Sequence, residues 1–446
     1  MSIFDRRRLT QATLKLNVDG LRRGVYSDRY FENVVRVLEL AHDVGYTFAG
    51  ISPRTLPVDP SGVAIGDLDV EAQVFNRRAP TALVAGVDVA LAVLRHATGY
   101  FQGDQFVQTW EGLVVEAVED GVLTEYGGDP EAVQPVLRIR GRYRDFALLE
   151  TPILGALSRA TRIATNVYHV VKAANGKGVL FFPARFDLPD TQPLDGYAYW
   201  LGVQRANVDT GRHVPPVVST DAQGAWWGGR GGGTIPHALI AAFLGDTAEA
   251  TTAFARALPL EVPRIALVDF NNDVVKDARA TLDAFWTRYR QSMRVGDMDD
   301  MRRWTLAGVR LDTSLNIRDV SLEPDGPKGV SPLLVRRVRA ALDKAWQSWG
   351  LPGVDIEAAR AYCRNVKIVV TGGFDAERIA RFEREHVPVD IYGVGSTLLR
   401  NDSGTNADYT MDIVRVKLGD QWVDMAKVGR RPNDNPNLKP VDLGPL

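Results

Sequence analysis

The sequence predicts an α/β protein with a C-terminal β/α barrel of the TIM type, regular or irregular, and an N-terminal α+β sandwich domain. Three observations predict this class. Short apolar runs alternate with amphipathic helical patterns in the C-terminal part of the chain, which is typical of parallel strands buried on both faces. Five such runs follow one another, and so many units favour a closed barrel over an open sheet. The N-terminal part instead mixes alternating strand patterns with helices.

The N-terminal elements follow from periodicity and from breaker residues. Helical spacing of apolar residues predicts two helices, and alternation of apolar with polar residues predicts two strands. The dipeptide Asp120-Gly121 interrupts a run of β-branched residues and predicts a hairpin. These elements are a helix over 28–45, a strand over 70–78, a helix over 81–99, the hairpin over 113–128 and a strand over 136–143.

A long helix is predicted over 146–174 and opens the barrel. The five strands are expected at 179–184, 264–269, 307–312, 366–372 and 389–395. From about residue 414 the pattern is strand-like again and ends in a tail rich in proline and asparagine. We therefore divide the chain into an N-terminal domain (1–145), a catalytic barrel (146–412) and C-terminal strands with a tail (413–446) that return to the N-terminal domain.

Composition excludes several classes of protein. The 446 residues contain 45% hydrophobic and 24% charged residues, and the formal net charge is −2, which gives no reason to expect a nucleic-acid partner. The single cysteine, Cys363, excludes an intramolecular disulfide framework and a cysteine-rich metal site. The chain start has no apolar signal-peptide core, and no apolar run is long enough to span a membrane. We expect a cytoplasmic protein whose basic run, Arg6 to Arg8, is a solvated terminus.

Candidate functional residues lie at the carboxyl ends of the predicted strands, where barrels carry their active sites. They comprise two arginines, two carboxylates and two glycine-rich turns: Arg185, Asp269, Arg310, Asp312, Gly372, Gly373, Gly393, Gly395 and Ser396. Glycine-rich turns expose N–H groups to phosphate, arginines bind phosphate in a bidentate manner, and carboxylates bind ribose hydroxyls or Mg²⁺. This set predicts a phosphorylated sugar as substrate.

A histidine, His237, lies in the stretch GGGTIPHAL (231–239). It follows the glycines, the threonine and the proline and directly precedes an apolar helical run. A lone histidine at such a position is an ordinary helix start more often than a catalytic group. An imidazole nitrogen can nevertheless take up a phosphoryl group, and the preceding glycines allow phosphates to approach the backbone.

Six motifs in order resemble the nicotinate phosphoribosyltransferase family, a group of type II phosphoribosyltransferases, over residues 24–430. They are SDRYF (27–31), GTIPHAL (233–239), RIALVDFNND (264–273), VRLDT (309–313), VTGGFD (370–375) and YGVGSTLL (392–399). The stretch STDAQGAWWGGRG (219–231) is similar to a family loop: Ser219 matches the family serine, whereas Thr220 and Asp221 depart from it.

The resemblance implies transfer of a phosphoribosyl group from phosphoribosyl pyrophosphate to nicotinate, which yields nicotinate mononucleotide and pyrophosphate in NAD salvage. It implies coupling to ATP hydrolysis through phosphorylation of His237. Asp269 and Asp312 would face ribose or metal, Arg310 would face phosphate, and the glycines with Ser396 would hold the 5′-phosphate. No motif for direct metal binding is present, so Mg²⁺ would be held mainly through pyrophosphate.

For the base, the resemblance implies that the pyridine ring stacks between Phe182 and an aromatic residue of a neighbouring subunit. That residue is Tyr30 of the Asp28-Arg29-Tyr30 stretch, and Asp28 is expected to contact substrate with it. A homodimer with shared active sites follows. Arg185 suits the nicotinate carboxylate because a guanidinium binds carboxylates in a bidentate manner.

Three alternatives stay open at this stage. The base could instead be nicotinamide, held by Asp209 or Asp221, or quinolinate, which requires more positive charge and no ATP. A phosphosugar isomerase or aldolase is a second alternative, although none of the predicted strand ends carries the lysine of a Schiff-base aldolase. A nucleotide-binding regulator with a decayed site is the third, and it predicts the loss of Arg310, Asp312 or His237, all of which are present.

Overall fold

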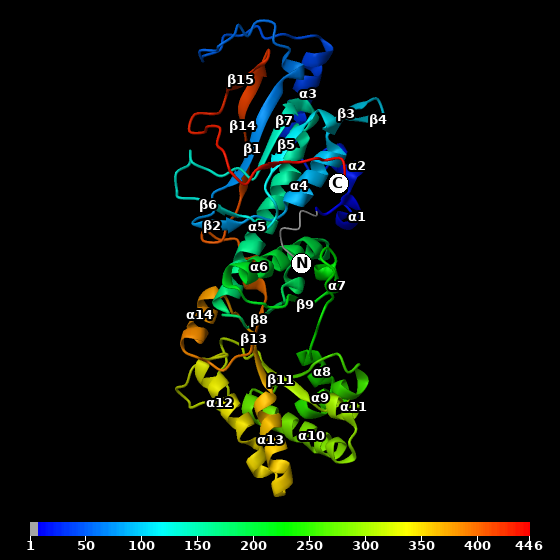
Figure 1. Cartoon of the computed structure of the whole chain (residues 1–446), viewed down its shortest axis with the longest axis vertical. Coiled ribbons are helices and arrows are strands. Elements are labelled where there is room, and N and C mark those ends of the chain that lie inside the picture. Colours follow the sequence, from blue (N-terminus) through cyan, green and yellow to red (C-terminus); the bar gives the residue numbers. More distant parts are fainter. Residues whose placement is uncertain (1–7) are drawn as a thin grey trace.

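The structure is a computed structural model that describes residues 8–446. The chain is elongated, with an antiparallel sheet at one end and a parallel sheet with its helices at the other (Figure 1). The long helix α5 (Glu150–Ala173) leads from the first part into the second (Figure 1). The predicted α/β class, with two structurally different parts, is confirmed.

The antiparallel part contains a six-stranded sheet in the order β15-β14-β1-β7-β5-β16. The strands are β1 (Asp69–Asn76), β5 (Val114–Ala117), β7 (Leu137–Arg142), β14 (Tyr409–Leu418), β15 (Gln421–Asp424) and β16 (Lys439–Pro440). Two small two-stranded sheets accompany it, β2 (Thr81–Leu83) with β6 (Leu123–Glu125) and β3 (Gly99–Gln102) with β4 (Gln105–Gln108). The helices are α1 (Gln11–Leu14), α2 (Val18–Arg22), α3 (Arg29–Asp43) and α4 (Val87–Ala97).

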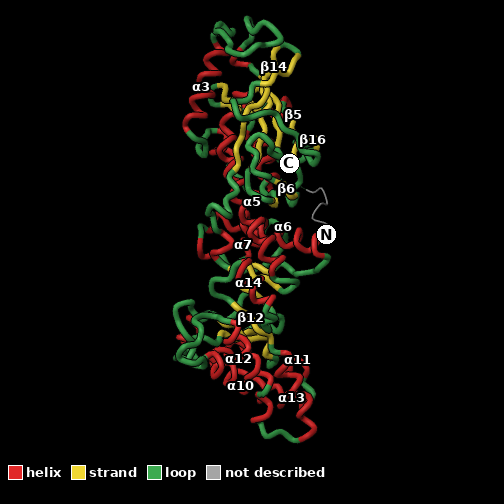
Figure 2. The backbone as a smooth tube through the Cα atoms, turned by 90° about the vertical axis from the view of Figure 1, so that its left-hand side faces the viewer, coloured by secondary structure: helices red, strands yellow, loops and turns green. Residues whose placement is uncertain are grey.

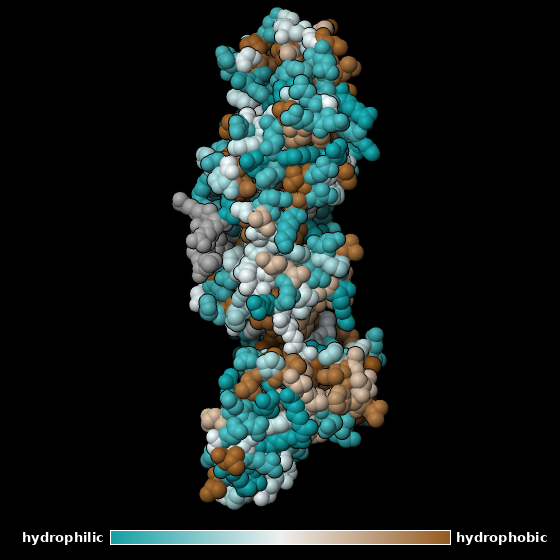
Figure 3. All heavy atoms as spheres, turned by 90° about the vertical axis from the view of Figure 1, so that its right-hand side faces the viewer, coloured by the Kyte–Doolittle hydropathy of each residue, from teal (hydrophilic) through white to brown (hydrophobic). Residues whose placement is uncertain are grey.

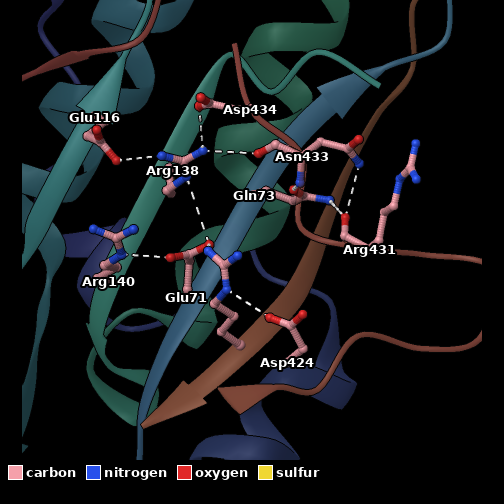
Figure 4. Close-up of polar contacts among 10 residues, drawn as sticks. Glu71, Gln73, Glu116, Arg138, Arg140, Asp424, Arg431, Asn433 and Asp434 are labelled. Atoms are coloured by element: carbon pink, nitrogen blue, oxygen red, sulfur yellow. Dashed lines mark hydrogen bonds and ion pairs between the residues drawn. The ribbon is translucent and has the colours of Figure 1, made fainter. Parts of the chain in front are cut away.

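The C-terminal strands return to the N-terminal sheet as expected, because β14 pairs antiparallel with β1 over Asn76↔Tyr409 to Val70↔Val416. One face of this sheet carries an ionic network (Figure 4). The buried Glu71 accepts hydrogen bonds from Arg140 at 2.7 Å and from Arg415 at 2.9 Å. The tail that follows β15 lies on the same face, where the Arg138 guanidinium donates to the Asn433 carbonyl at 3.0 Å. The domain boundaries at 145 and 412 stay a prediction.

Two N-terminal expectations are wrong. The predicted hairpin over 113–128 does not form, because β5 pairs with β7 and β16 whereas β6 pairs with β2. The Asp120 carboxylate instead accepts a 2.8 Å hydrogen bond from the Val87 N–H at the start of α4. The helix predicted over 81–99 begins only at Val87, because residues 81–83 form strand β2.

The basic run at the chain start is not simply solvated. Arg6 and Arg7 lie outside the described residues. Arg8 lies within them, and its guanidinium forms a 2.9 Å ion pair with Asp88, a carboxylate that is almost completely buried. Arg8 also donates to the Val118 carbonyl. It therefore ties the chain start to the core of the N-terminal part.

The parallel part contains six strands in the order β10-β11-β12-β13-β8-β9. They are β8 (Gly178–Phe181), β9 (Val217–Val218), β10 (Arg264–Leu267), β11 (Leu306–Leu311), β12 (Lys367–Val370) and β13 (Ile391–Val394). The five predicted barrel strands are all present, and β9 is additional. Because the edge strands β9 and β10 do not pair in this sheet, the barrel takes the irregular form, a curled half-barrel.

Helices cover the parallel sheet (Figure 2). Besides α5 they are α6 (Gln192–Thr210), α7 (Asp221–Gly224), α8 (His237–Ala242), α9 (Thr247–Ala257), α10 (Val274–Val295), α11 (Met298–Arg303), α12 (Pro332–Asp343), α13 (Gly353–Asn365) and α14 (Ala376–Arg384). Within residues 8–446, no helix combines the length and the apolar character that a membrane crossing requires.

Residues 228–236, here called the glycine segment, cross the open side of the half-barrel. Gly231 forms a parallel bridge with Val218 of β9. At the other end, Ile235 is fully buried in a small apolar cluster with Ile240 of α8 and Leu267 of β10. The molecule narrows at this level, as Figure 3 shows. The glycine segment therefore joins the two unpaired edges that strand pairing leaves open.

Candidate active site

The candidate site lies at the carboxyl edge of the parallel sheet. Asp269 follows β10, Arg310 lies in β11 with Asp312 just after it, and Gly372 and Gly373 follow β12. Because the pairings from β10 through β13 to β8 are all parallel, the carboxyl ends of these strands lie at the same edge. The fold therefore brings the predicted strand-end residues to one edge, although they lie far apart in the sequence.

His237 joins this edge from the glycine segment. It is the first residue of α8, and its Nε2 atom lies 3.1 Å from each carboxylate oxygen of Asp269. The His237 side chain is 46% exposed and the Asp269 side chain only 9%. Burial raises the pKa of Asp269, the contact with His237 opposes this rise, and the charge of Asp312 adds to it. The pair leaves the imidazole accessible to a ligand.

Arg310 holds the glycine segment in place. Its guanidinium donates to the Thr234 hydroxyl at 2.8 Å and to the Ile235 carbonyl at 3.0 Å. Burial lowers the pKa of Arg310, whereas the charges of Asp312 and Asp269 raise it. The glycine segment, which directly precedes His237, is thereby fixed to β11 by a cationic side chain.

Five residues form what we call the glycine cradle: Gly372, Gly373, Gly393, Gly395 and Ser396. Gly372 has a φ of +91°, and a Cβ atom on it would lie 3.3 Å from Asp312 Oδ1. A Cβ atom on Gly393 would lie 2.4 Å from Thr371 Cγ2 and 3.2 Å from the Phe182 ring. Side chains are therefore excluded where these turns pass Asp312 and Phe182.

Phe182 and Arg185 follow β8 on the same edge. The Phe182 N–H donates to the Val394 carbonyl at 2.9 Å, so the half-buried ring lies beside the end of β13. Arg185 is exposed, and its guanidinium lies 5.2 Å from the centre of the Phe186 ring. Among the described residues Arg185 has no carboxylate partner, so it can accept one from a ligand.

Ser219 and Asp221 organise the loop after β9. The Ser219 hydroxyl and N–H both donate to Gln223 Oε1 at 3.1 Å. Thr220 caps the short helix α7, and Asp221 accepts a 2.9 Å hydrogen bond from the Gly231 N–H. Both predicted substrate residues therefore have a positioning contact in the loop, and their contact with substrate stays a prediction.

Trp226 and Trp227, which follow this loop, pack against other residues of the same chain. The Trp227 indole N–H donates to the Gln223 carbonyl at 2.9 Å, and the rings of Trp226 and Tyr197 lie 6.0 Å apart. Trp226 is half-buried and packs against the apolar cores of both parts of the chain.

Tyr30 and Asp28 are not brought to this edge within one chain. Asp28 accepts hydrogen bonds from the Thr151 hydroxyl at 3.1 Å and from the Tyr30 hydroxyl at 3.4 Å. They lie at the start of α3, and this helix lies beside the antiparallel sheet and apart from β8 (Figure 1). Tyr30 is 59% exposed.

Two arginines of α5 that the sequence patterns did not single out lie close to this edge. Arg159 forms ion pairs with Asp187 at 2.6 Å and Asp195 at 2.7 Å, just beyond Arg185. The guanidinium of Arg162, one turn later, forms no hydrogen bond or ion pair with any residue of the described chain. A signal was present in the sequence, since two arginines interrupt an otherwise apolar helical pattern at a spacing of three.

Asp269 and Asp312 fit a magnesium ion chemically, because carboxylate oxygens are ligands that Mg²⁺ prefers. The part of the chain that the structure describes contains no group of three histidine, cysteine or acidic side chains arranged to hold a metal ion. A metal ion here would therefore take further oxygen ligands from a bound diphosphate or from water.

Comparison with known proteins places this fold among phosphoribosyltransferases. Residues 47–161 match the family described as quinolinate phosphoribosyl transferase, N-terminal domain. The crystal structure of nicotinate-nucleotide pyrophosphorylase from Pyrococcus furiosus is similar, with 26% identity, 93% of this chain and 80% of that chain covered, and a TM-score of 0.61. The structure of human nicotinic acid phosphoribosyltransferase has the same fold at 18% identity, with 88% and 75% covered and a TM-score of 0.51.

An antiparallel-sheet domain on a parallel half-barrel, with arginine, aspartate and glycine turns at the carboxyl edge, defines a type II phosphoribosyltransferase. Within this class, the chain is similar to the nicotinate and quinolinate phosphoribosyltransferases. The family predicted from the sequence motifs is confirmed. The protein is therefore a transferase of pyridine nucleotide biosynthesis.

Proposed function

We propose that this chain is an ATP-dependent nicotinate phosphoribosyltransferase of the cytoplasm. It transfers the phosphoribosyl group of phosphoribosyl pyrophosphate to nicotinate and releases nicotinate mononucleotide and pyrophosphate. Its partners are these small molecules and ATP, without nucleic acid or membrane. The contact between His237 and Asp269, at the edge where the substrate phosphates would lie, is the observation that carries the proposal.

The geometry of His237 suits phosphorylation. When the Nε2–H donates to the Asp269 carboxylate, the lone pair lies on Nδ1, which becomes the nucleophile. Nδ1 attacks the γ-phosphorus of ATP, the bond to the β-phosphate oxygen breaks, and ADP leaves with the bonding pair. The carboxylate also stabilises the positive charge on the imidazole during attack. Hydrolysis of the phosphohistidine later restores the imidazole and releases phosphate.

Arg185 and Phe182 suit the base. The exposed guanidinium pairs with the nicotinate carboxylate, and the Phe182 ring offers an aromatic face for the pyridine. The ring nitrogen of nicotinate then attacks C1 of the ribose as the bond to pyrophosphate breaks. Because the substrate supplies the nucleophile, the protein contributes mainly by positioning the reactants.

The glycine cradle holds the 5′-phosphate of phosphoribosyl pyrophosphate through backbone N–H groups. Arg310 faces the diphosphate group of the same substrate. Mg²⁺ would be held by the diphosphate with Asp269 and Asp312, and it would neutralise charge on the leaving group. The ribose hydroxyls can also donate hydrogen bonds to the two carboxylates.

The active form is a homodimer with shared sites, in which Tyr30 of one subunit stacks on the base held by the other. The exposed face of α3 supports this proposal. It carries Val37 and Leu40, and Val44 follows at the end of the helix with the same helical spacing; each is more than 60% exposed. Such an apolar stripe is typical of a surface that another protein covers. Tyr30 lies at the start of the same helix.

Quinolinate is the second candidate base, favoured by the family that residues 47–161 match. Quinolinate has two carboxylates and therefore needs more positive charge beside Phe182 than nicotinate does. Arg162 is the additional cation without a partner in the described chain. Against this candidate, the transfer to quinolinate makes no use of the contact between His237 and Asp269.

The test is product formation by the purified protein with Mg²⁺ and phosphoribosyl pyrophosphate. Nicotinate, quinolinate and nicotinamide are offered separately, each with and without ATP. We expect nicotinate mononucleotide from nicotinate, with a rate that ATP raises in wild-type protein and not in His237→Ala. Turnover of quinolinate without any effect of ATP would contradict the proposal.

A further inference from the structure

A buried hydrogen-bond relay connects the end of β1 with the turn that follows β13. The Arg78 guanidinium donates to Asn166 Oδ1 at 2.8 Å and to the Thr405 carbonyl at 2.8 Å. The Asn166 amide in turn donates to the Leu398 carbonyl at 3.0 Å and to the Arg400 carbonyl at 3.3 Å. Both side chains are more than 90% buried. The relay thus joins the antiparallel part, helix α5 and the residues directly after the glycine cradle.

The relay ends on the short helical turn that carries Ser396. This turn spans Ser396–Leu399 and follows Gly393 and Gly395 without a break. Asn166 contacts the carbonyl of its penultimate residue, Leu398, and the carbonyl of Arg400 just after its end, so the C-terminal side of the turn is fixed to α5. Thr397 fixes it from the other side by donating to the Phe374 carbonyl at 2.7 Å.

Arg78 also brings a buried positive charge to this place. It donates only to neutral oxygens, namely the Asn166 amide and the carbonyls of Thr405 and Arg162, and the described chain offers it no carboxylate at ion-pair distance. Burial, together with the charge of Arg162 and against the charge of Asp402, lowers the pKa of Arg78 to about 10, so the guanidinium is still protonated at neutral pH. A buried cation without a carboxylate in direct contact favours a nearby anion.

We propose that Arg78 and Asn166 are positioning residues for the 5′-phosphate of the ribosyl substrate. They act through the turn Ser396–Leu399, which they hold in the position that aims the glycine cradle at the phosphate. This inference rests on the proposed function only in that the substrate carries a ribose 5-phosphate. The identity of the base does not enter it.

The relay contacts one side of the site only. On the side of the site, the Asn166 amide donates to the carbonyls of Leu398 and Arg400, in and directly after the turn that follows β13, whereas Arg310 lies in β11 and donates to Thr234 and Ile235 of the glycine segment. Loss of the relay should therefore weaken binding of the ribose 5-phosphate end and spare the pyrophosphate end. A purely structural role would instead change both alike, or change stability alone.

Two variants test the proposal: Arg78→Lys, which keeps the charge but cannot reach three acceptors, and Asn166→Ala, which removes the relay and keeps Arg78. The dissociation constants of ribose 5-phosphate and of pyrophosphate are measured separately by calorimetry, together with kcat and KM for phosphoribosyl pyrophosphate. We expect each variant to raise the Kd of ribose 5-phosphate and the KM about tenfold, with a smaller change in kcat. The Kd of pyrophosphate should stay within about twofold.

Arg264→Lys is the matched control. Arg264 is also a buried arginine that donates to backbone carbonyls, but it lies at the start of β10, at the opposite edge of the sheet. It should lower stability and leave both dissociation constants unchanged. Equal changes in the two constants, or no change in either, for both relay variants would overturn the inference. Wild-type protein that binds neither ribose 5-phosphate nor phosphoribosyl pyrophosphate would instead refute the proposed function.

Discussion

The Nε2 atom of His237 is equidistant, at 3.1 Å, from the two carboxylate oxygens of Asp269. His237 directly follows the glycine segment, whereas Asp269 follows the edge strand β10. Their contact therefore joins the segment to the sheet. It also leaves Nδ1 as the imidazole nitrogen that does not contact Asp269.

Asp269→Asn should reduce phosphorylation of His237 by ATP on the order of a hundredfold, because a neutral amide stabilises the imidazolium less well. Incubation with γ-labelled ATP, followed by acid-labile phosphate analysis, measures this. His237→Gln provides the baseline without any phosphohistidine. Unchanged labelling in Asp269→Asn would show that the carboxylate has no part in the step.

Arg310→Lys should lower kcat/KM roughly ten- to a hundredfold, which corresponds to about 1.5 to 3 kcal/mol for lost hydrogen bonds to a charged group. A lysine cannot donate at once to the Thr234 hydroxyl and the Ile235 carbonyl in the geometry that the guanidinium uses. Steady-state kinetics measure the loss. A variant that keeps full activity would mean that the glycine segment needs no tie to β11.

Gly393→Ala should destabilise the protein by about 1 to 3 kcal/mol and raise the KM for phosphoribosyl pyrophosphate, because the added methyl group overlaps Thr371 and presses on Phe182. Urea unfolding and kinetics give the two numbers. Gly155→Ala is the control: Gly155 is exposed on α5, and its Cβ would meet no atom within 4 Å. That control should gain about 0.5 to 1 kcal/mol. The reverse order of stabilities would refute the packing argument.

Asp120→Asn should flatten the pH dependence of stability. Burial, aided by the charge of Asp88, raises the pKa of Asp120 to about 8, whereas the unfolded value is about 4. The native state therefore binds a proton that the unfolded state lacks, so stability falls as pH rises from about 4 to about 8, by at most about 1.4 kcal/mol per pH unit. Urea midpoints at pH values of about 5.5, 6.5 and 7.5 test this. An equally steep decline in the variant would contradict it, and Asp104→Asn in an exposed turn controls for general charge effects.

Mixed dimers test the shared site. Measured as the part of the rate that ATP adds, Tyr30→Ala and His237→Ala should each be nearly inactive, and co-expression of the two should restore about a quarter of the wild-type value, because half of the dimers then hold one complete site. The restored activity should disappear when both changes are placed in the same chain. Inactive mixtures would mean that Tyr30 serves a site within its own subunit or none.

The strand-end residues were predictable because each follows a short apolar run that can only be a buried strand. Arg310 and Asp312 at the end of β11, and the glycine pair after β12, are examples. The prediction failed at 113–128 because the β-branched alternation says nothing about which partner a strand takes. No local pattern reveals that the Asp120 carboxylate caps α4. Arg78 and Arg162 escaped prediction for a related reason: they approach the site from a strand end and a helix, and only the fold brings them together.

The pairing of β14 with β1 has a consequence for the making of the protein. During synthesis on the ribosome, β1 is made early. The edge of β1 that pairs with β14 stays unpaired until the chain has been translated past residue 418. An unpaired strand edge is a site for mispairing with other chains. The half-barrel between these two strands can fold in the meantime, so the nascent chain would complete its catalytic part first and would need protection of its amino-terminal sheet until release.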